Sequence, residues 1–137
     1  MSAIIQESVR ETLRESICVQ QALLDDAATL RLVVRAGRAF AAALRRGNEI
    51  LLFGNGGGAA DAQHIATAKT KGLLTVGLTG KNGNAPAELA DFCFCVPSAS
   101  TPRIQEGHTL IGQKICDITE SLLAVPQPKR KRNSNKR

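Results

Sequence analysis

The chain has 137 residues, of which 43% are hydrophobic, so it is long enough to bury one core without disulfides or a structural metal. Because Trp and Tyr are absent, that core must be largely aliphatic. No apolar run approaches the length of about 18 residues that a membrane span needs. Charged residues such as Glu7 and Arg10 interrupt the N-terminal segment, so we expect that it is not a signal peptide. We therefore expect a cytoplasmic protein that has no contact with a membrane.

The net charge of +6 is located in the C-terminal tail. Residues 125–137 read VPQPKRKRNSNKR and hold six Lys and Arg without an acid, so the preceding body is neutral. This composition predicts a disordered basic tail after a folded domain at residues 1–124. We interpret the tail as a solvated end, and nonspecific contact with nucleic acid is the alternative.

Two amphipathic helices are predicted at the N-terminus. Apolar residues at helical spacing define the first of them: Ile5, Val9, Leu13, Ile17 and Leu24. A second apolar series follows: Leu30, Val33, Val34, Phe40 and Leu44. Asp25 or Asp26 can cap this second helix, and Gly47 ends it.

Short strands and helices alternate in the rest of the body. Apolar runs predict strands at residues 50–53, 73–78 and 92–96, with a helix from about 59 to 70 after the first strand. A last helix is predicted to run to about Leu123, with Thr101 as its cap and Pro102 in its first turn. Strands separated by helices indicate a parallel sheet with helices on its faces.

The four cysteines are expected to be free thiols in a reducing compartment, because no export signal accompanies them. We interpret them as buried. Cys93 and Cys95 belong to the third predicted strand. We expect them on opposite faces of that strand, and hence not as a metal-binding pair.

A glycine-rich segment, GNGGGAAD at residues 54–61, follows the first predicted strand and opens a helix. Glycines let the backbone approach a phosphate closely, and the free N–H groups of a helix N-terminus hold anions. A dinucleotide site would need an acid about 20 residues further on. No acid occurs between Ala62 and Ala87, so this alternative is weak. A glycine turn without a ligand is the other alternative.

Three segments resemble the sugar-isomerase (SIS) family, and most nearly the phosphoheptose isomerases: GNGGGAADAQHIA at 54–66, TVGLTGKNG at 75–83 and TPRIQEGH at 101–108. The resemblance implies a flavodoxin-like parallel sheet with helices on both faces, preceded by an N-terminal helix pair. Here the sheet is reduced to about three strands. It also implies the conversion of sedoheptulose 7-phosphate to a heptose 7-phosphate, at zinc-containing sites between the subunits of a tetramer.

The same resemblance assigns site residues. Asn55, Gly56 and Gly57 match the loop that contacts the sugar phosphate, and Gln105 matches a residue that contacts both substrate and metal. His64 matches a second metal ligand. Zinc takes three or four protein ligands, so two residual ligands argue against its retention here. His108, in the last segment, is expected to be a structural histidine.

Both positions where the family carries its proton donors and acceptors have changed. They correspond to Ala68, four residues after His64, and Gln113, eight residues after Gln105. Isomerisation through an enediol needs an acid and a base, and neither side chain titrates. Two strand–helix units of the family, roughly 60–70 residues with a second phosphate loop, are also missing near residues 66–71.

We therefore predict a sugar-phosphate-binding protein of the phosphoheptose isomerase type with impaired catalysis. A homodimer or homotetramer is expected, because the first helix packs between subunits in the family. The alternatives are a non-catalytic oligomeric scaffold, similar to the replication-initiator-associating SIS protein, and a decayed gene product without a selected role.

Overall fold

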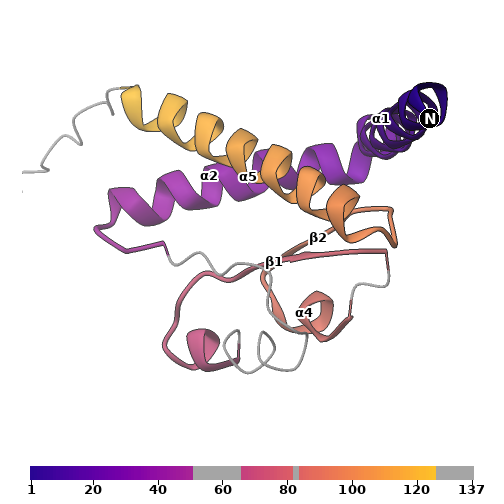
Figure 1. The fold of residues 1–137 in the computed structure, drawn as a ribbon. Coiled ribbons are helices and arrows are strands. Elements are labelled where there is room, and N and C mark those ends of the chain that lie inside the picture. Colours follow the sequence, from indigo (N-terminus) through magenta and orange to yellow (C-terminus); the bar gives the residue numbers. More distant parts are fainter. Residues whose placement is uncertain (51–65, 82–83, 126–137) are drawn as a thin grey trace, which may run out of the picture.

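A computed structural model describes residues 1–50, 66–81 and 84–125 of the chain. Its elements, in chain order, are α1 (Ser2–Asp25), α2 (Ala27–Arg45), β1 (Val76–Thr79), α4 (Asn84–Leu89), β2 (Phe92–Cys95) and α5 (Thr101–Ala124) (Figure 1). Residues 66–70 are helical as well. An N-terminal helix pair followed by alternating strands and helices confirms the predicted α/β class.

The two described strands form a parallel pair. Their register runs from Val76 opposite Phe92 to Thr79 opposite Cys95, and α4 lies in the connection between them. In Figure 1, α2 and α5 lie together above the strands and α4 lies below them. Helices therefore flank both faces of the sheet, as in the reduced SIS-type fold. The first predicted strand, residues 50–53, lies outside the described residues except for Ile50.

The hydrophobic core lies between β2, α2 and α5. Its buried members are Leu23, Val33, Ala36, Phe40, Phe92, Phe94, Val96, Ile111 and Ile115. Glycines allow the layers to approach closely: a Cβ atom on Gly107 would lie 2.7 Å from a methyl carbon of Val96, and one on Gly37 would lie 2.6 Å from Ile118. The helices are thus packed against each other and against the sheet without space for extra methyl groups.

The predicted ends of α2 are confirmed. Asp26, not Asp25, caps its N-terminus: the carboxylate accepts hydrogen bonds from the Ala28 N–H at 2.9 Å and the Thr29 hydroxyl at 2.7 Å. Gly47, with φ of 79°, follows the C-terminus, and the N–H groups of residues 47 and 48 donate back to carbonyls of the last turn. This is the Schellman arrangement, which requires a residue with positive φ.

The predicted cap of the last helix was wrong by one residue. α5 begins at Thr101, and Ser100 takes the capping position without a side-chain hydrogen bond. Pro102 lies in the first turn, as predicted, where its missing N–H costs no helical hydrogen bond. The predicted helix end near Leu123 agrees with the observed end at Ala124.

Two expectations about the cysteines were also wrong. Residues two apart on a strand point to the same face, so Cys93 and Cys95 are neighbours on β2 and not on opposite sides. Burial was wrong too, because Cys93 is half-buried and Cys18, Cys95 and Cys116 are exposed. All four are free thiols, as expected.

α1 is joined to α5 by a buried arginine. The Arg103 guanidinium donates to the carbonyl oxygen of Thr12 at 2.5 Å and pairs with the Glu106 carboxylate at 2.6 Å. Glu106 in turn accepts a hydrogen bond from the Ser16 hydroxyl at 2.8 Å. Both ends of this network are on α1, so it fixes the position of α1 against the start of α5.

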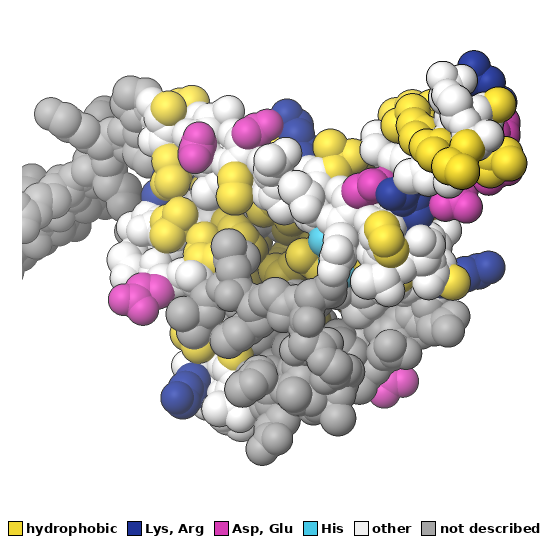
Figure 2. Space-filling view, viewed as in Figure 1, with side chains coloured by type: hydrophobic (Ala, Val, Ile, Leu, Met, Phe, Trp, Pro, Cys, Tyr) yellow, Lys and Arg dark blue, Asp and Glu magenta, His cyan; other side chains and the backbone are white. Residues whose placement is uncertain are grey.

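The apolar face of α1 remains open to solvent. We call it the α1 stripe; its members are 54–66% exposed and are Ile5, Val9, Leu13, Ile17 and Leu24. Figure 2 shows it as a yellow ridge at the upper right. The sequence predicted the amphipathic pattern correctly, but within one chain the apolar side has little to pack against.

None of the helices in the described part of the chain combines the length and apolarity that crossing a membrane would need. The basic residues of the C-terminal tail, from 126 onward, lie outside the described residues, so both interpretations of the tail stay predictions.

Candidate functional site

The outward face of α5 carries both glutamines that the resemblance assigned to the site. Gln105 and Gln113 are eight residues apart and share one helical face. This face lines a cavity of about 510 Å³ together with Pro102, Glu106, Thr109 and Leu110. The structure therefore brings these two predicted positions together.

The chemistry available on this face is limited to hydrogen bonding. Amide side chains donate and accept hydrogen bonds but do not exchange protons near neutral pH. The carboxylate of Glu106 is paired with Arg103 at 2.6 Å and bonded to Ser16. No other titratable side chain occurs among the residues that line this cavity. The face can hold a polar ligand, but it offers no free acid or base.

Ala68 occupies a different environment. It is buried, with 7% of its surface exposed, in the middle of the helical residues 66–70. Its carbonyl oxygen accepts hydrogen bonds from the N–H groups of Lys71 and Leu73, and Gly72 between them has φ of 71°. This is a second Schellman arrangement, and it turns the chain towards β1. Ala68 is not one of the residues that line the α5 cavity.

The glycine loop with Asn55, Gly56 and Gly57, and the residual metal ligand His64, lie outside the described residues. Their roles stay predictions. At the described positions, Gln105, Gln113 and Ala68 supply no imidazole, thiolate or carboxylate for zinc. The described part of the chain also holds no group of three or more His, Cys, Asp or Glu arranged for a metal ion. These residues do not fit a zinc site.

His108 acts as a structural residue, as predicted. Its Nε2 atom lies 3.1 Å from the backbone carbonyl oxygen of Thr79 at the end of β1. Because a carbonyl oxygen only accepts hydrogen bonds, Nε2 carries the hydrogen. The same oxygen accepts the Val96 N–H at 2.9 Å. The imidazole therefore fastens α5 to the carboxyl end of the sheet.

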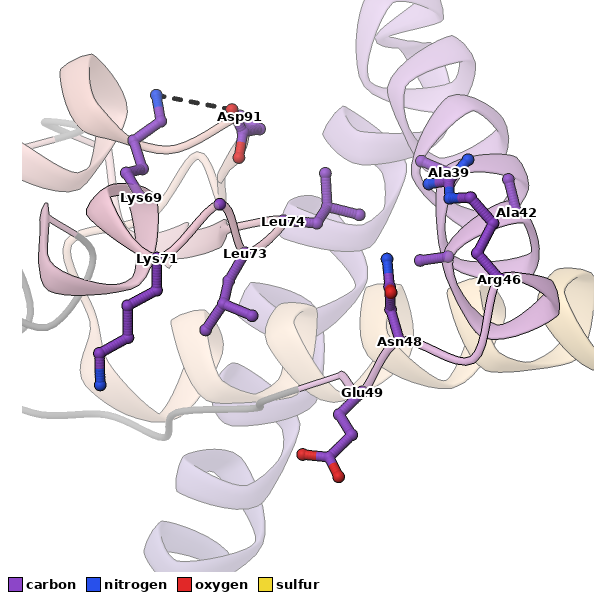
Figure 3. Close-up of a pocket in the computed structure, with 12 residues that line it drawn as sticks. Ala39, Ala42, Arg46, Asn48, Glu49, Lys69, Lys71, Leu73, Leu74 and Asp91 are labelled. Atoms are coloured by element: carbon purple, nitrogen blue, oxygen red, sulfur yellow. Dashed lines mark ion pairs between the residues drawn. The ribbon is translucent and has the colours of Figure 1, made fainter.

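A second cavity, which sequence reasoning missed, lies at the amino end of the two described strands, next to the residues that precede β1 and β2. Its volume is about 800 Å³. Figure 3 shows that its walls come from the end of α2, the turn after it and the segment that leads into β1. Cations and anions both line it: Arg46, Lys69, Lys71, Glu49 and Asp91. These residues come from three separate segments and form no local motif, so no sequence signal pointed to this cavity.

Asp91 is the most constrained charge in this second cavity. Its carboxylate accepts hydrogen bonds from the backbone N–H and hydroxyl of Thr75, at 2.9 and 2.7 Å, and pairs with Lys69 at 3.5 Å. Burial raises the pKa of Asp91, but the Thr75 hydrogen bonds and the Lys69 charge outweigh it and hold the pKa below its usual range. Asp91 thus links the start of β2 to the start of β1.

No family model matches the chain, but individual relatives do. Phosphoheptose isomerase 2 of Campylobacter jejuni is 31% identical to it, over 80% of this chain and 89% of that protein. The chain belongs to the phosphoheptose isomerase family. The phosphoheptose isomerase of Aneurinibacillus thermoaerophilus is 29% identical over 87% of this chain and 96% of its own length. That of Sulfurimonas denitrificans is 57% identical over 54 residues, 39% of this chain and 28% of that protein.

These alignments are longer than the chain itself. The alignment with the C. jejuni protein spans 179 positions but includes only 80% of the 137 residues here, so roughly 70 positions have no counterpart in this chain. The A. thermoaerophilus alignment spans 189 positions and includes 87% of the chain, so again roughly 70 positions have no counterpart in this chain. This agrees with the predicted loss of two strand–helix units.

Proposed function

We propose that this chain binds a sugar phosphate at the glycine loop of residues 54–58 but isomerises it poorly or not at all. The observation that carries the proposal is Gln113. At the position where the resemblance implies a catalytic histidine, an amide side chain lines the α5 cavity. Position 68, which would hold the matching glutamate, carries a buried alanine.

The two losses affect catalysis more than binding. A positioned general acid or base contributes about 10²–10⁴ to the rate, so removing both lowers turnover by several orders of magnitude. Phosphate binding at a helix N-terminus uses backbone N–H groups and does not need either side chain. Binding without turnover is therefore the outcome that this combination of residues supports.

Thermal unfolding tests the binding part. Sedoheptulose 7-phosphate or inorganic phosphate at millimolar concentration should raise Tm, since a ligand at a hundredfold excess over Kd stabilises by about 2.7 kcal/mol. Gly56→Val should abolish the shift by blocking the approach of a phosphate. Gly112→Ala is the matched control, because a Cβ there meets no atom within 4 Å. The absence of any shift in the unmutated chain would contradict the proposal.

A scaffold role is the second candidate, and the α1 stripe favours it. Five large apolar side chains on one helix face are 54–66% exposed, and a contiguous patch of this kind is typical of an interface. We propose that copies of this chain associate through the stripe as a homodimer or homotetramer. A cytoplasmic location belongs to the same proposal, because four free thiols persist in a reducing compartment.

A further inference from the structure

Two thiols lie side by side at the carboxyl end of the sheet. Cys93 and Cys95 belong to β2, opposite Gly77 and Thr79 of β1. Phe92 and Phe94 alternate with the two cysteines along β2 and are buried in the core, so both thiols point to the other face. The Thr79 hydroxyl reaches the Sγ atom of Cys95 at 3.3 Å. The two thiols therefore lie on one face of a strand that is hydrogen-bonded to its neighbour, and not on a loop.

We propose that Cys93 and Cys95 form a two-thiolate site for a soft cation of the Cu(I) class. Thiolates are soft ligands and select such ions over hard cations. The described part of the chain places no third His, Cys, Asp or Glu with them. Zinc takes three or four protein ligands. Cu(I) is a soft ion that thiolates select, and it can bind with two of them.

The strand geometry favours a bridging ion over a disulfide. The Cα atoms of residues two apart on a strand are about 6.6 Å apart, and side chains on the same face start at a similar separation. A disulfide needs the two Cβ atoms to be only about 3.8 Å apart. Two metal–sulfur bonds of about 2.3 Å span up to about 4.6 Å between the sulfur atoms. Cys93 and Cys95 can therefore hold one ion between them without leaving the strand, but closing a disulfide would distort it.

Proton release accompanies binding. Burial, and then the neighbouring Cys95, raise the pKa of the Cys93 thiol to about 11, so Cys93 is protonated at neutral pH when no metal is bound. On binding, both S–H bonds break, two sulfur–metal bonds form, and two protons pass to the solvent without any change in oxidation state. The Thr79 hydroxyl supports the Cys95 thiolate by donating to it. Cys95 is exposed, which gives the ion a path to the site.

The test uses the full chain with Cys18→Ser and Cys116→Ser, which keeps only this pair of thiols. Cu(I) is titrated without oxygen in competition with the coloured chelator bathocuproine disulfonate. The protein should withdraw about one ion per chain. Its apparent affinity should rise by up to about 100-fold per pH unit near neutrality, because two protons leave.

Single variants in that background decide the outcome. Cys95→Ser and Cys93→Ser should each withdraw almost no Cu(I). Cys95 is exposed, so Cys95→Ser is expected to fold, and circular dichroism checks this. If Cys93→Ser does not fold, the Cu(I) titration of Cys95→Ser by itself tests the proposal. Retention of Cu(I) by Cys95→Ser would overturn the proposal. One ion per two chains would overturn it as well, because the ion would then bridge two molecules.

Discussion

The Nε2 atom of His108 lies 3.1 Å from the backbone carbonyl oxygen of Thr79, which fastens the second turn of α5 to the end of β1. On the same side of α5, Gly107 lies against Val96. These contacts fix the rotation of the helix about its axis. As a result, Gln105 and Gln113 face outward and line the α5 cavity.

The close approach of α5 to β2 leads to a prediction about two glycines of that helix. Gly107→Ala should lower the free energy of unfolding by about 1–3 kcal/mol, because its Cβ would lie 2.7 Å from Val96. Gly112→Ala should raise it by up to about 1 kcal/mol, since alanine favours the helix and the space around position 112 is open. Urea denaturation at one protein concentration compares them, and equal effects would contradict this packing.

Asp91 leads to a prediction about pH. Its pKa is lowered in the folded chain, so its contribution to stability is present above the unfolded pKa of about 3.9 and is lost as the pH falls through the folded value. Asp91→Asn should therefore destabilise the protein at pH 7, by about 1 kcal/mol for a charged hydrogen bond at a partly exposed site.

The difference in the free energy of unfolding between Asp91→Asn and the unmutated chain should shrink below about pH 4. Asp117→Asn is the matched control, because its pair with Lys114 is 3.5 Å long and more than half exposed. It should change stability very little at either pH. If Asp91→Asn lowers the free energy of unfolding by the same amount at pH 7 and pH 3, the charge of Asp91 does not contribute to stability.

The α1 stripe leads to a prediction about assembly. Light scattering at roughly tens of micromolar protein should give a multiple of the 14.6 kDa chain mass. Leu13→Lys with Ile17→Lys should shift the mass to one chain by placing two charges in the stripe. Glu11→Lys, on the charged side of the same helix, should leave the assembly intact. A monomeric unmutated chain would refute association through the stripe.

Local signals predicted the stop of α2 at Gly47 and the two apolar strands, because each of these signals acts within a few residues. They left the cap of α2 open between Asp25 and Asp26. They did not predict α4, and they placed the start of β1 three residues too early. Partnerships between distant segments left no such signal. The Arg103–Thr12 and Asp91–Thr75 contacts join separate elements, and nothing at either position alone indicates them.

The site was predicted in the same uneven way. The resemblance to the family assigned Gln105 and Gln113, and the structure places both on one face of α5. The second cavity was missed, because its walls meet only after α2 and the segment before β1 have packed. The predicted burial of Cys95 was wrong because apolar neighbours in sequence do not determine which face of β2 stays open.

Turnover of sedoheptulose 7-phosphate by the purified chain, with zinc added, tests the central claim most directly. With Ala68 and Gln113 in place of a proton donor and acceptor, heptose 7-phosphate should not form above background. Ala68→Glu with Gln113→His should not restore full activity, because the second phosphate loop that the resemblance implies would still be absent. Turnover of about 1 s⁻¹ or faster by the unmutated chain, within the ordinary range of enzymes, would contradict the claim that its catalysis is impaired.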